Sequence, residues 1–200
     1  MASRYLLMIC AFTAIGKFSA TFVYNNFQHA LRVQGLGVEE RTALFSAMNF
    51  YSQSGTLAFQ AVLAAALMRL AGVGTTLAMA CGVIVGLFVW LAVDAGLWPL
   101  MVAKVVQEIV GYGLLVPAQQ GLFTVVSRAE KYESKAFVDT VVFRGSDVVA
   151  GNVCDALTRF SVSAAALALV PLAGAWMALG AWLGREQAAR SQSTDSKKSP

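Results

Sequence analysis

Seven charged and amide side chains lie in stretches that are mostly apolar, and these residues are the best suited in the chain to bind a ligand. They are Lys17, Asn49, Gln53, Lys104, Glu108, Arg144 and Asp147. Lysine and arginine attract anions, arginine can hold two oxygens of one phosphate, and amides both donate and accept hydrogen bonds. The group predicts a substrate-binding site for an anionic solute, with Lys17, Lys104 and Arg144 contacting the anion.

A structural role for the charged pairs is the alternative. Lys104 and Glu108 are spaced i, i+4, so they can neutralise each other on one face of a helix. Arg144 and Asp147 can do the same at i, i+3. The two carboxylates would then hold their cations in place while the site is empty. Buried ion pairs stabilise proteins poorly, because desolvation offsets most of their attraction, and this favours the binding role.

No pattern in the chain predicts catalysis. The only histidine is His29, and the sequence has no zinc-protease motif, no nucleophile elbow and no phosphate-binding glycine loop. The three cysteines lie in apolar stretches without the spacing of metal ligands. The sequence therefore predicts a protein that is not an enzyme and that uses no metal or cofactor.

The composition places these residues in a membrane protein. Of the 200 residues, 58% are hydrophobic and 13% are charged, and the mean hydropathy is +0.64. A soluble domain of this size cannot keep so much apolar surface away from water. The net charge of +4 need not indicate a nucleic-acid partner, because cytoplasmic loops of membrane proteins collect lysine and arginine. The expected surroundings are a lipid bilayer.

Six apolar stretches are long enough to cross a bilayer, since a spanning helix needs about 20 residues. They cover 5–28, 43–68, 75–93, 97–116, 136–159 and 161–183. Pro117 predicts a kink or a stop after the fourth stretch. We therefore expect an all-α, polytopic bundle of six transmembrane helices over 1–184 and a disordered cytoplasmic tail over 185–200.

Lysine and arginine are distributed unevenly between the loops. With six crossings, nine of these residues lie on one side of the membrane and three on the other. The nine are Arg4, Arg69, Arg128, Lys131, Lys135, Arg185, Arg190, Lys197 and Lys198, and the three are Arg32, Arg41 and Arg159. The positive-inside rule predicts that both termini lie in the cytoplasm, in the inner (plasma) membrane of a cell.

The polar side chains follow a repeat of three helices. The first, second, fourth and fifth stretches each carry a polar face, and Asn49 and Gln53 belong to the face of the second. The third and sixth stretches contain no charged residue, and their polar residues are a few threonines and serines. They contain the glycine pairs Gly82 with Gly86 and Gly180 with Gly184, which fit close helix packing or chance in alanine- and glycine-rich helices. The order polar, polar, apolar, repeated once, predicts the 3+3 repeat of one half of a major-facilitator transporter.

The stretch 122–147 resembles a known family. It reads LFTVVSRAEKYESKAFVDTVVFRGSD. Bacterial members of the nucleotide-transporter family, which includes the ATP:ADP antiporters of plastids and obligate intracellular bacteria, typically read LFTVVSREEKYKAKNFIDTVVYRGGD there. The opening Tyr5-Leu-Leu-Met and the loop 69–74 fit that family more weakly. The resemblance covers most of the chain and is specific at 122–147.

The resemblance implies half of a transporter. Members of the family have about twelve spans, built as two halves, and this chain resembles the C-terminal half alone. It therefore implies a second six-helix unit, either another copy of the chain or a separate chain, and an anionic substrate such as ATP or ADP exchanged by alternating access. The alternative is a non-transporting membrane protein, such as a decayed half-transporter or an assembly scaffold.

Overall fold

The computed structural model describes residues 2–126, 130, 132, 136–158 and 161–196, and every element among them is helical. This confirms the all-α class. The α-helices are α1 (Ala2–Val33), α2 (Val38–Phe59), α3 (Ala65–Val93), α4 (Leu97–Val110), α5 (Val116–Leu122), α7 (Phe143–Thr158) and α8 (Val162–Ser196). Three π-helical turns, η1 (Gln60–Ala64), η2 (Gly111–Leu115) and η4 (Val138–Val142), and the 3₁₀ turn η3 (Phe123–Val125) complete the fold.

Four helices in the described residues are long and apolar enough to cross a membrane. They cover Arg4–Val33, Val38–Val93, Leu97–Val125 and Val162–Gln192. The predicted fifth stretch, 136–159, is not among them. Its described part forms η4 and α7, which carry Arg144 and Asp147. The chain is thus a helical membrane bundle, while six crossings and the 3+3 repeat stay predictions.

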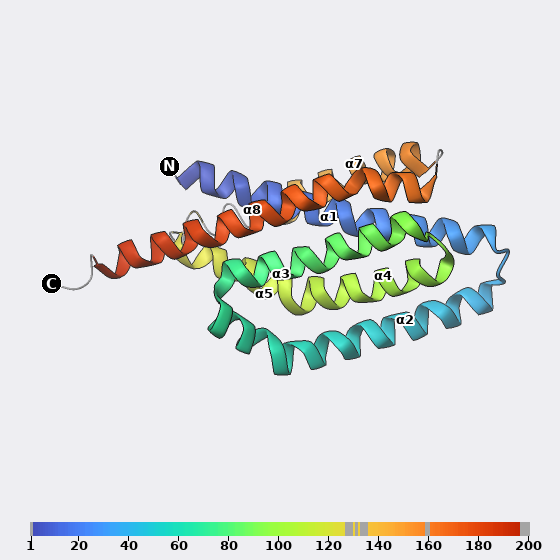
Figure 1. Cartoon of the computed structure of the whole chain (residues 1–200), viewed down its shortest axis with the longest axis horizontal. Helices are drawn as coiled ribbons and strands as arrows, with labels where there is room; N and C mark the ends of the chain where they lie inside the picture. Colours follow the sequence, from blue (N-terminus) through green and yellow to red (C-terminus); the bar gives the residue numbers. More distant parts are fainter. Residues whose placement is uncertain (1, 127–129, 131, 133–135, 159–160, 197–200) are drawn as a thin grey trace.

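The helix Val38–Val93 is 56 residues long and contains a break. At Gly72 the backbone has φ 77° and ψ 166°, a conformation open to glycine and strained for other residues. The chain bends there, and the rest of α3 runs back in the opposite direction to α2 (Figure 1). The predicted stretches 43–68 and 75–93 lie on the two sides of this bend.

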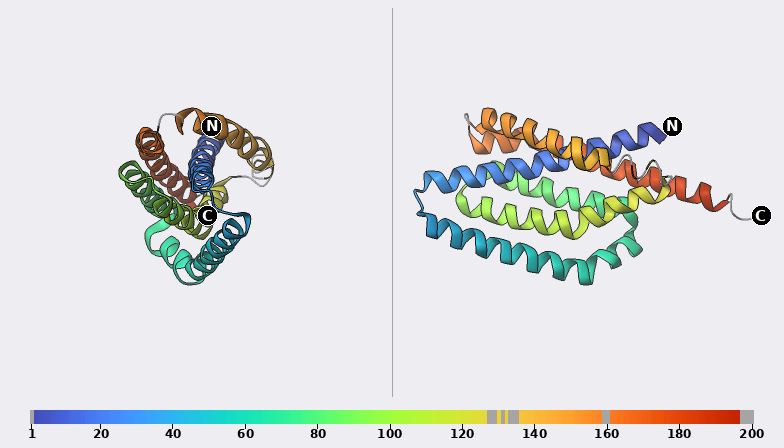
Figure 2. Two further views of the ribbon diagram at one scale, coloured as in Figure 1. Left: turned by 90° about the vertical axis from the view of Figure 1, so that its right-hand side faces the viewer. Right: turned by 180° about the vertical axis from the view of Figure 1, so that it is seen from behind.

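The helices run roughly parallel to one long axis. The N-terminus and the C-terminal end of α8 lie toward one end of the bundle, and the turns at 34–37 and 94–96 lie at the other (Figure 1). α1 lies inside the bundle in contact with α4, α7 and α8, while α8 packs along α3 and α2 packs along α4 (Figure 2). Aromatic pairs fill the contacts between these helices: the ring centroids are 5.1 Å apart for Phe12 and Trp176 and 5.7 Å for Phe22 and Phe88.

Glycines let α3 and α8 approach very closely. A Cβ atom on Gly184 would lie 1.9 Å from the Cα of Gly74. A Cβ atom on Gly180 would lie 3.0 Å from a ring carbon of Phe12. The Gly180 and Gly184 spacing is therefore a packing face. A Cβ atom on Gly82 would lie 3.7 Å from Met177 Sδ, whereas a Cβ atom on Gly86 would have no neighbour within 4 Å.

The helix beginning at Leu97 does not stop at Pro117. It widens into the π-helical turn η2 and continues as α5 to Leu122. A π-turn uses i→i+5 hydrogen bonds and holds one extra residue. It ends at Leu115, two residues before Pro117, which has no N–H to donate. The Gln60 side-chain amide donates a hydrogen bond to the Tyr112 carbonyl at 2.8 Å, which joins η1 to η2.

The last helix extends further than the sequence predicted. α8 continues to Ser196, where a disordered tail from residue 185 was expected. Alanine, glutamate, glutamine and arginine favour helix in this region. Arg190 Nε lies 2.9 Å from Glu186 Oε1, and its guanidinium lies 4.5 Å from the ring centroid of Tyr5. The Tyr5 hydroxyl donates to the Leu122 carbonyl at 2.9 Å, so α1, α5 and α8 are joined at this end.

Candidate functional site

A cavity of about 460 Å³ lies among α1, α4, η2 and α5. Phe143 of α7 and Trp176 of α8 contribute to its wall. Its volume falls in the range of small-molecule sites, about 300–1,000 Å³. Two lysines and one glutamate of the predicted site line it: Lys17, Lys104 and Glu108.

The polar face of α1 points into the cavity. Thr13, Lys17, Thr21 and Tyr24 recur every three or four residues along the helix, and all of them line it. The Lys17 ammonium lies 4.4 Å from the ring centroid of Phe143, a cation–π distance. α7 packs along α1, so Phe143 covers Lys17 from the side.

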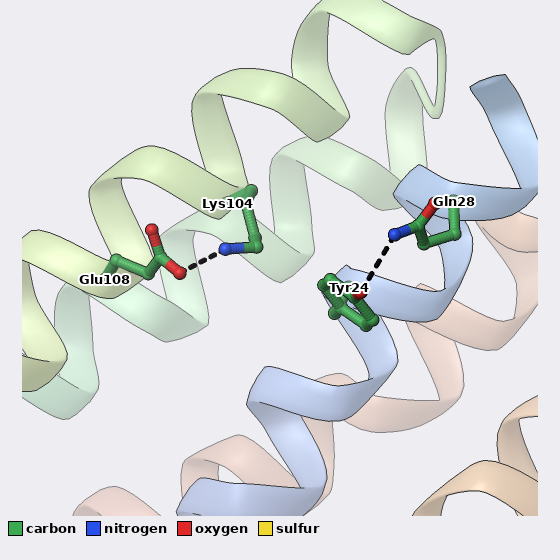
Figure 3. Close-up of polar contacts among 4 residues, drawn as sticks. All are labelled: Tyr24, Gln28, Lys104 and Glu108. Carbon is green, nitrogen blue, oxygen red and sulfur yellow. Dashed lines mark hydrogen bonds and ion pairs between the residues drawn. The ribbon is translucent and has the colours of Figure 1, made fainter. Parts of the chain in front are cut away.

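The polar face of α4 forms the facing wall. Lys104 forms an ion pair with Glu108, as the i, i+4 spacing predicted (Figure 3). The two side chains are mostly buried, with exposed fractions of 14% and 28%. Lys104 Nζ lies 5.8 Å from the ring centroid of Tyr24 on α1, and Gln28 Nε2 donates to the Tyr24 hydroxyl at 2.9 Å. α1 and α4 thus meet across the cavity through aromatic and charged groups.

Amide side chains also tie α1 to the opposite wall. Gln107 Nε2 donates to Ser19 Oγ at 3.0 Å. Gln119 Nε2, on α5, donates to Thr13 Oγ1. Both glutamines are buried or half-buried, so these bonds satisfy donors that the surrounding apolar residues cannot.

The predicted pair of Arg144 and Asp147 is wrong for this structure. Among the described residues, the ion pairs are those of Lys104 with Glu108 and Arg190 with Glu186. Asp147 Oδ1 instead accepts a hydrogen bond from Thr21 Oγ1 at 3.0 Å. The packing of α7 on α1 supplies a donor to the carboxylate that the i, i+3 spacing could not reveal. Arg144 is exposed and does not line the cavity.

The polar face of α2 divides into two sides. Ser52 and Thr56 are buried, on the side where Gly55 packs against Ile109 of α4. Asn49 and Gln53 are exposed, and neither lines the cavity. The structure therefore does not bring these two predicted site residues together with Lys17, Lys104 and Glu108.

Several cavity residues were not singled out by the sequence. Trp176 belongs to the sixth predicted stretch, 161–183, which contains no charged residue. Its side chain is only 1% exposed, and its Nε1 donates to the Phe12 carbonyl at 2.8 Å. Gly16 leaves the space for it, because a Cβ atom there would lie 2.8 Å from Trp176 Cζ2. The pairing of a glycine with an indole across two helices has no signal in a single sequence.

The described residues contain no group of three or more histidine, cysteine, aspartate or glutamate side chains that could hold a metal ion. No protein-family model, curated protein or solved structure matches the chain.

Proposed function

We propose that the chain is one six-helix half or subunit of a membrane transporter for an anionic solute. The observation that carries this proposal is the cavity, in which Lys17 and Lys104 lie between helices long and apolar enough to span a membrane. A charge at mid-membrane costs at least about 2.5–3.5 kcal/mol. Such residues usually mark a ligand or ion path for that reason. The nucleotide is the substrate that the resemblance of 122–147 implies.

A second six-helix unit is part of the proposal. Transporters of the major-facilitator kind move one bundle against another around a site at the membrane midplane. Asn49 and Gln53 on α2, and Arg144 on α7, are exposed on this chain. Polar groups facing hydrocarbon are costly, and side chains of this kind hydrogen-bond across helices in membranes. A second unit packed on these helices would cover them.

The proposed topology is six crossings with both termini in the cytoplasm. Reporter fusions after Gly35, Gly72 and Gly96 test it. If α2 with η1 crosses the membrane once and α3 crosses back after the Gly72 bend, Gly35 and Gly96 report the same outer side and Gly72 reports the cytoplasm. Opposite readouts from Gly35 and Gly96 would mean that Val38–Val93 crosses only once, and would reject the six-span proposal.

The second unit is testable by crosslinking. In a background without the three native cysteines, Gln53→Cys should crosslink in native membranes to another copy of the chain or to a separate chain. Thr56→Cys is the matched control, since Thr56 is buried one turn away and should give no product.

Transport itself is tested with the crosslinked assembly in proteoliposomes. We expect it to take up labelled anions, and the isolated chain to show only background uptake, because one bundle leaves its polar face open. Uptake by the single chain would reject the two-unit proposal. Background uptake by the complete assembly, for nucleotides and for other anions alike, would favour the scaffold alternative.

A further inference from the structure

We infer that the solute bound in the cavity is an organic monoanion with an apolar, ring-sized body, and that Lys17 binds its negative group. This inference rests on the function proposed above and specifies the charge and polarity of the solute. Four observations carry it: the charge balance of the cavity, the hydrogen bonds already made within it, the chemistry of its floor and its volume.

The charge balance leaves one cation over. Among the side chains that the structure describes, three charged ones line the cavity: Lys17, Lys104 and Glu108. Glu108 forms an ion pair with Lys104, so Lys17 is the cation whose charge this glutamate does not neutralise. Among the residues whose side chains the structure describes, no carboxylate lies within ion-pair distance of Lys17, and Asp147, one turn beyond Phe143, accepts a hydrogen bond from Thr21 instead. The described side chains of the wall therefore carry one net positive charge.

The two glutamines of the wall already donate hydrogen bonds within the protein. Gln107 donates to Ser19 and Gln119 to Thr13, in both cases across to α1. The Lys17 ammonium, in contrast, lies over the face of Phe143, and among the described residues it has no hydrogen bond to an oxygen. A carboxylate placed against it would gain a charge-assisted hydrogen bond without breaking one that exists.

Part of the cavity lining, formed by Phe12, Ile84 and Trp176 and called its floor here, is apolar. Trp176 and Phe12 lie with their ring centroids 5.1 Å apart. The indole N–H is bonded to a backbone carbonyl, so it is not free for a ligand. Ile84 adds a further apolar group. An apolar ring of the solute would bury its surface here, which is worth about 25 cal/mol for each Å² removed from water.

A nucleoside polyphosphate fits this wall poorly. A terminal phosphate alone carries about −1.5 to −2 charges, and this cavity of about 460 Å³ offers one unpaired cation and an apolar floor. The extra negative charges would be removed from water without a partner, which is costly. Arg144, the cation best suited to a phosphate, is not in the wall.

The test measures binding to the full chain, with any partner unit that co-purifies, in lipid nanodiscs by calorimetry. The probes are naphthylacetate, its neutral isostere naphthylacetamide, and ADP. We expect naphthylacetate to bind at least about tenfold more tightly than the amide, which corresponds to about 1.4 kcal/mol. Lys17→Gln should reduce this preference to near unity. Lys17→Arg keeps the charge and should retain it.

Arg32→Gln is the matched control, because it removes an exposed cation that lies outside the cavity; it should leave the preference unchanged. Equal binding of acid and amide, an equal loss in Arg32→Gln, or tighter binding of ADP than of naphthylacetate would overturn the inference. Uptake assays separate it from the proposed function. If the assembly takes up ADP but not naphthylacetate, the transport proposal stands and the inference of a monoanionic solute is rejected. Lys17-dependent binding without uptake of any anion supports the monoanion site and removes the transport proposal.

Discussion

One methyl group added at Gly184 should destabilise the bundle by about 1–3 kcal/mol, the usual cost of overpacking a close contact. The new Cβ atom would lie 1.9 Å from the Cα of Gly74, which is backbone and cannot rotate away. α3 and α8 would have to move apart along their contact. Thermal unfolding of Gly184→Ala in detergent or nanodiscs measures the effect, and Gly74→Ala should act in the same direction.

Gly86→Ala provides a control of opposite sign. It lies in the same helix as Gly74, and a Cβ atom there meets no neighbour within 4 Å. Alanine in place of a glycine inside a helix is expected to stabilise by about 0.5–1 kcal/mol. Equal changes in Gly86→Ala and Gly184→Ala would contradict the close crossing of α3 and α8.

Glu108→Gln should destabilise the bundle by about 3 kcal/mol. The substitution leaves the Lys104 ammonium without its counter-charge in a wall where both side chains are mostly buried, and breaking a buried pair costs about 3–5 kcal/mol. The expected cost lies at the lower end of this range because the Glu108 side chain is 28% exposed to solvent. The double variant Lys104→Met with Glu108→Leu should recover most of the loss, since apolar residues of similar size can replace a buried pair.

The Glu186 and Arg190 pair is the comparison. It has the same i, i+4 spacing but lies beyond the apolar part of α8, with exposed fractions of 36% and 28%. Glu186→Gln should change the unfolding free energy by less than about 1 kcal/mol. If Glu108→Gln is equally mild, the Lys104 pair is solvated. If the double variant is as unstable as the single one, the charges themselves are required for the fold.

The helices and one ion pair followed from local sequence. Long apolar stretches predict spanning helices because each must bury its backbone hydrogen bonds in lipid. Lys104 and Glu108 meet because residues four apart on a helix are neighbours. Arg144 and Asp147 are also near in sequence, yet Thr21 on another helix competes for the carboxylate. Local spacing therefore predicts possible ion-pair partners, and the packing of the helices determines which of these pairs form.

The parts of the site that the sequence could not reveal depend on contacts between distant helices. Trp176 reaches the cavity because Gly16 has no side chain, and the two are separated by most of the chain. The polar face of α2 covers a wide arc, and only packing against α4 decides that Ser52 is buried while Asn49 and Gln53 are exposed. The periodicity of polar residues identifies a polar face, but it does not identify which residues of other helices pack against that face.

The wide turn η2 corrects a rotational drift along the cavity wall. Residues of this wall recur in steps of four, in one row of Lys104, Glu108, Tyr112 and Val116 and another of Gln107, Gly111, Leu115 and Gln119. In a regular α-helix, which turns about 100° per residue, each step of four drifts by about 40°. A turn that holds one extra residue rotates the rows back. Deleting one residue from 111–115 would therefore let the turn close into a regular α-helix and leave Gln119 facing Thr13. Deleting two residues would rotate α5 by about 100° and carry Gln119 away from Thr13, while leaving Lys104 and Glu108 in place.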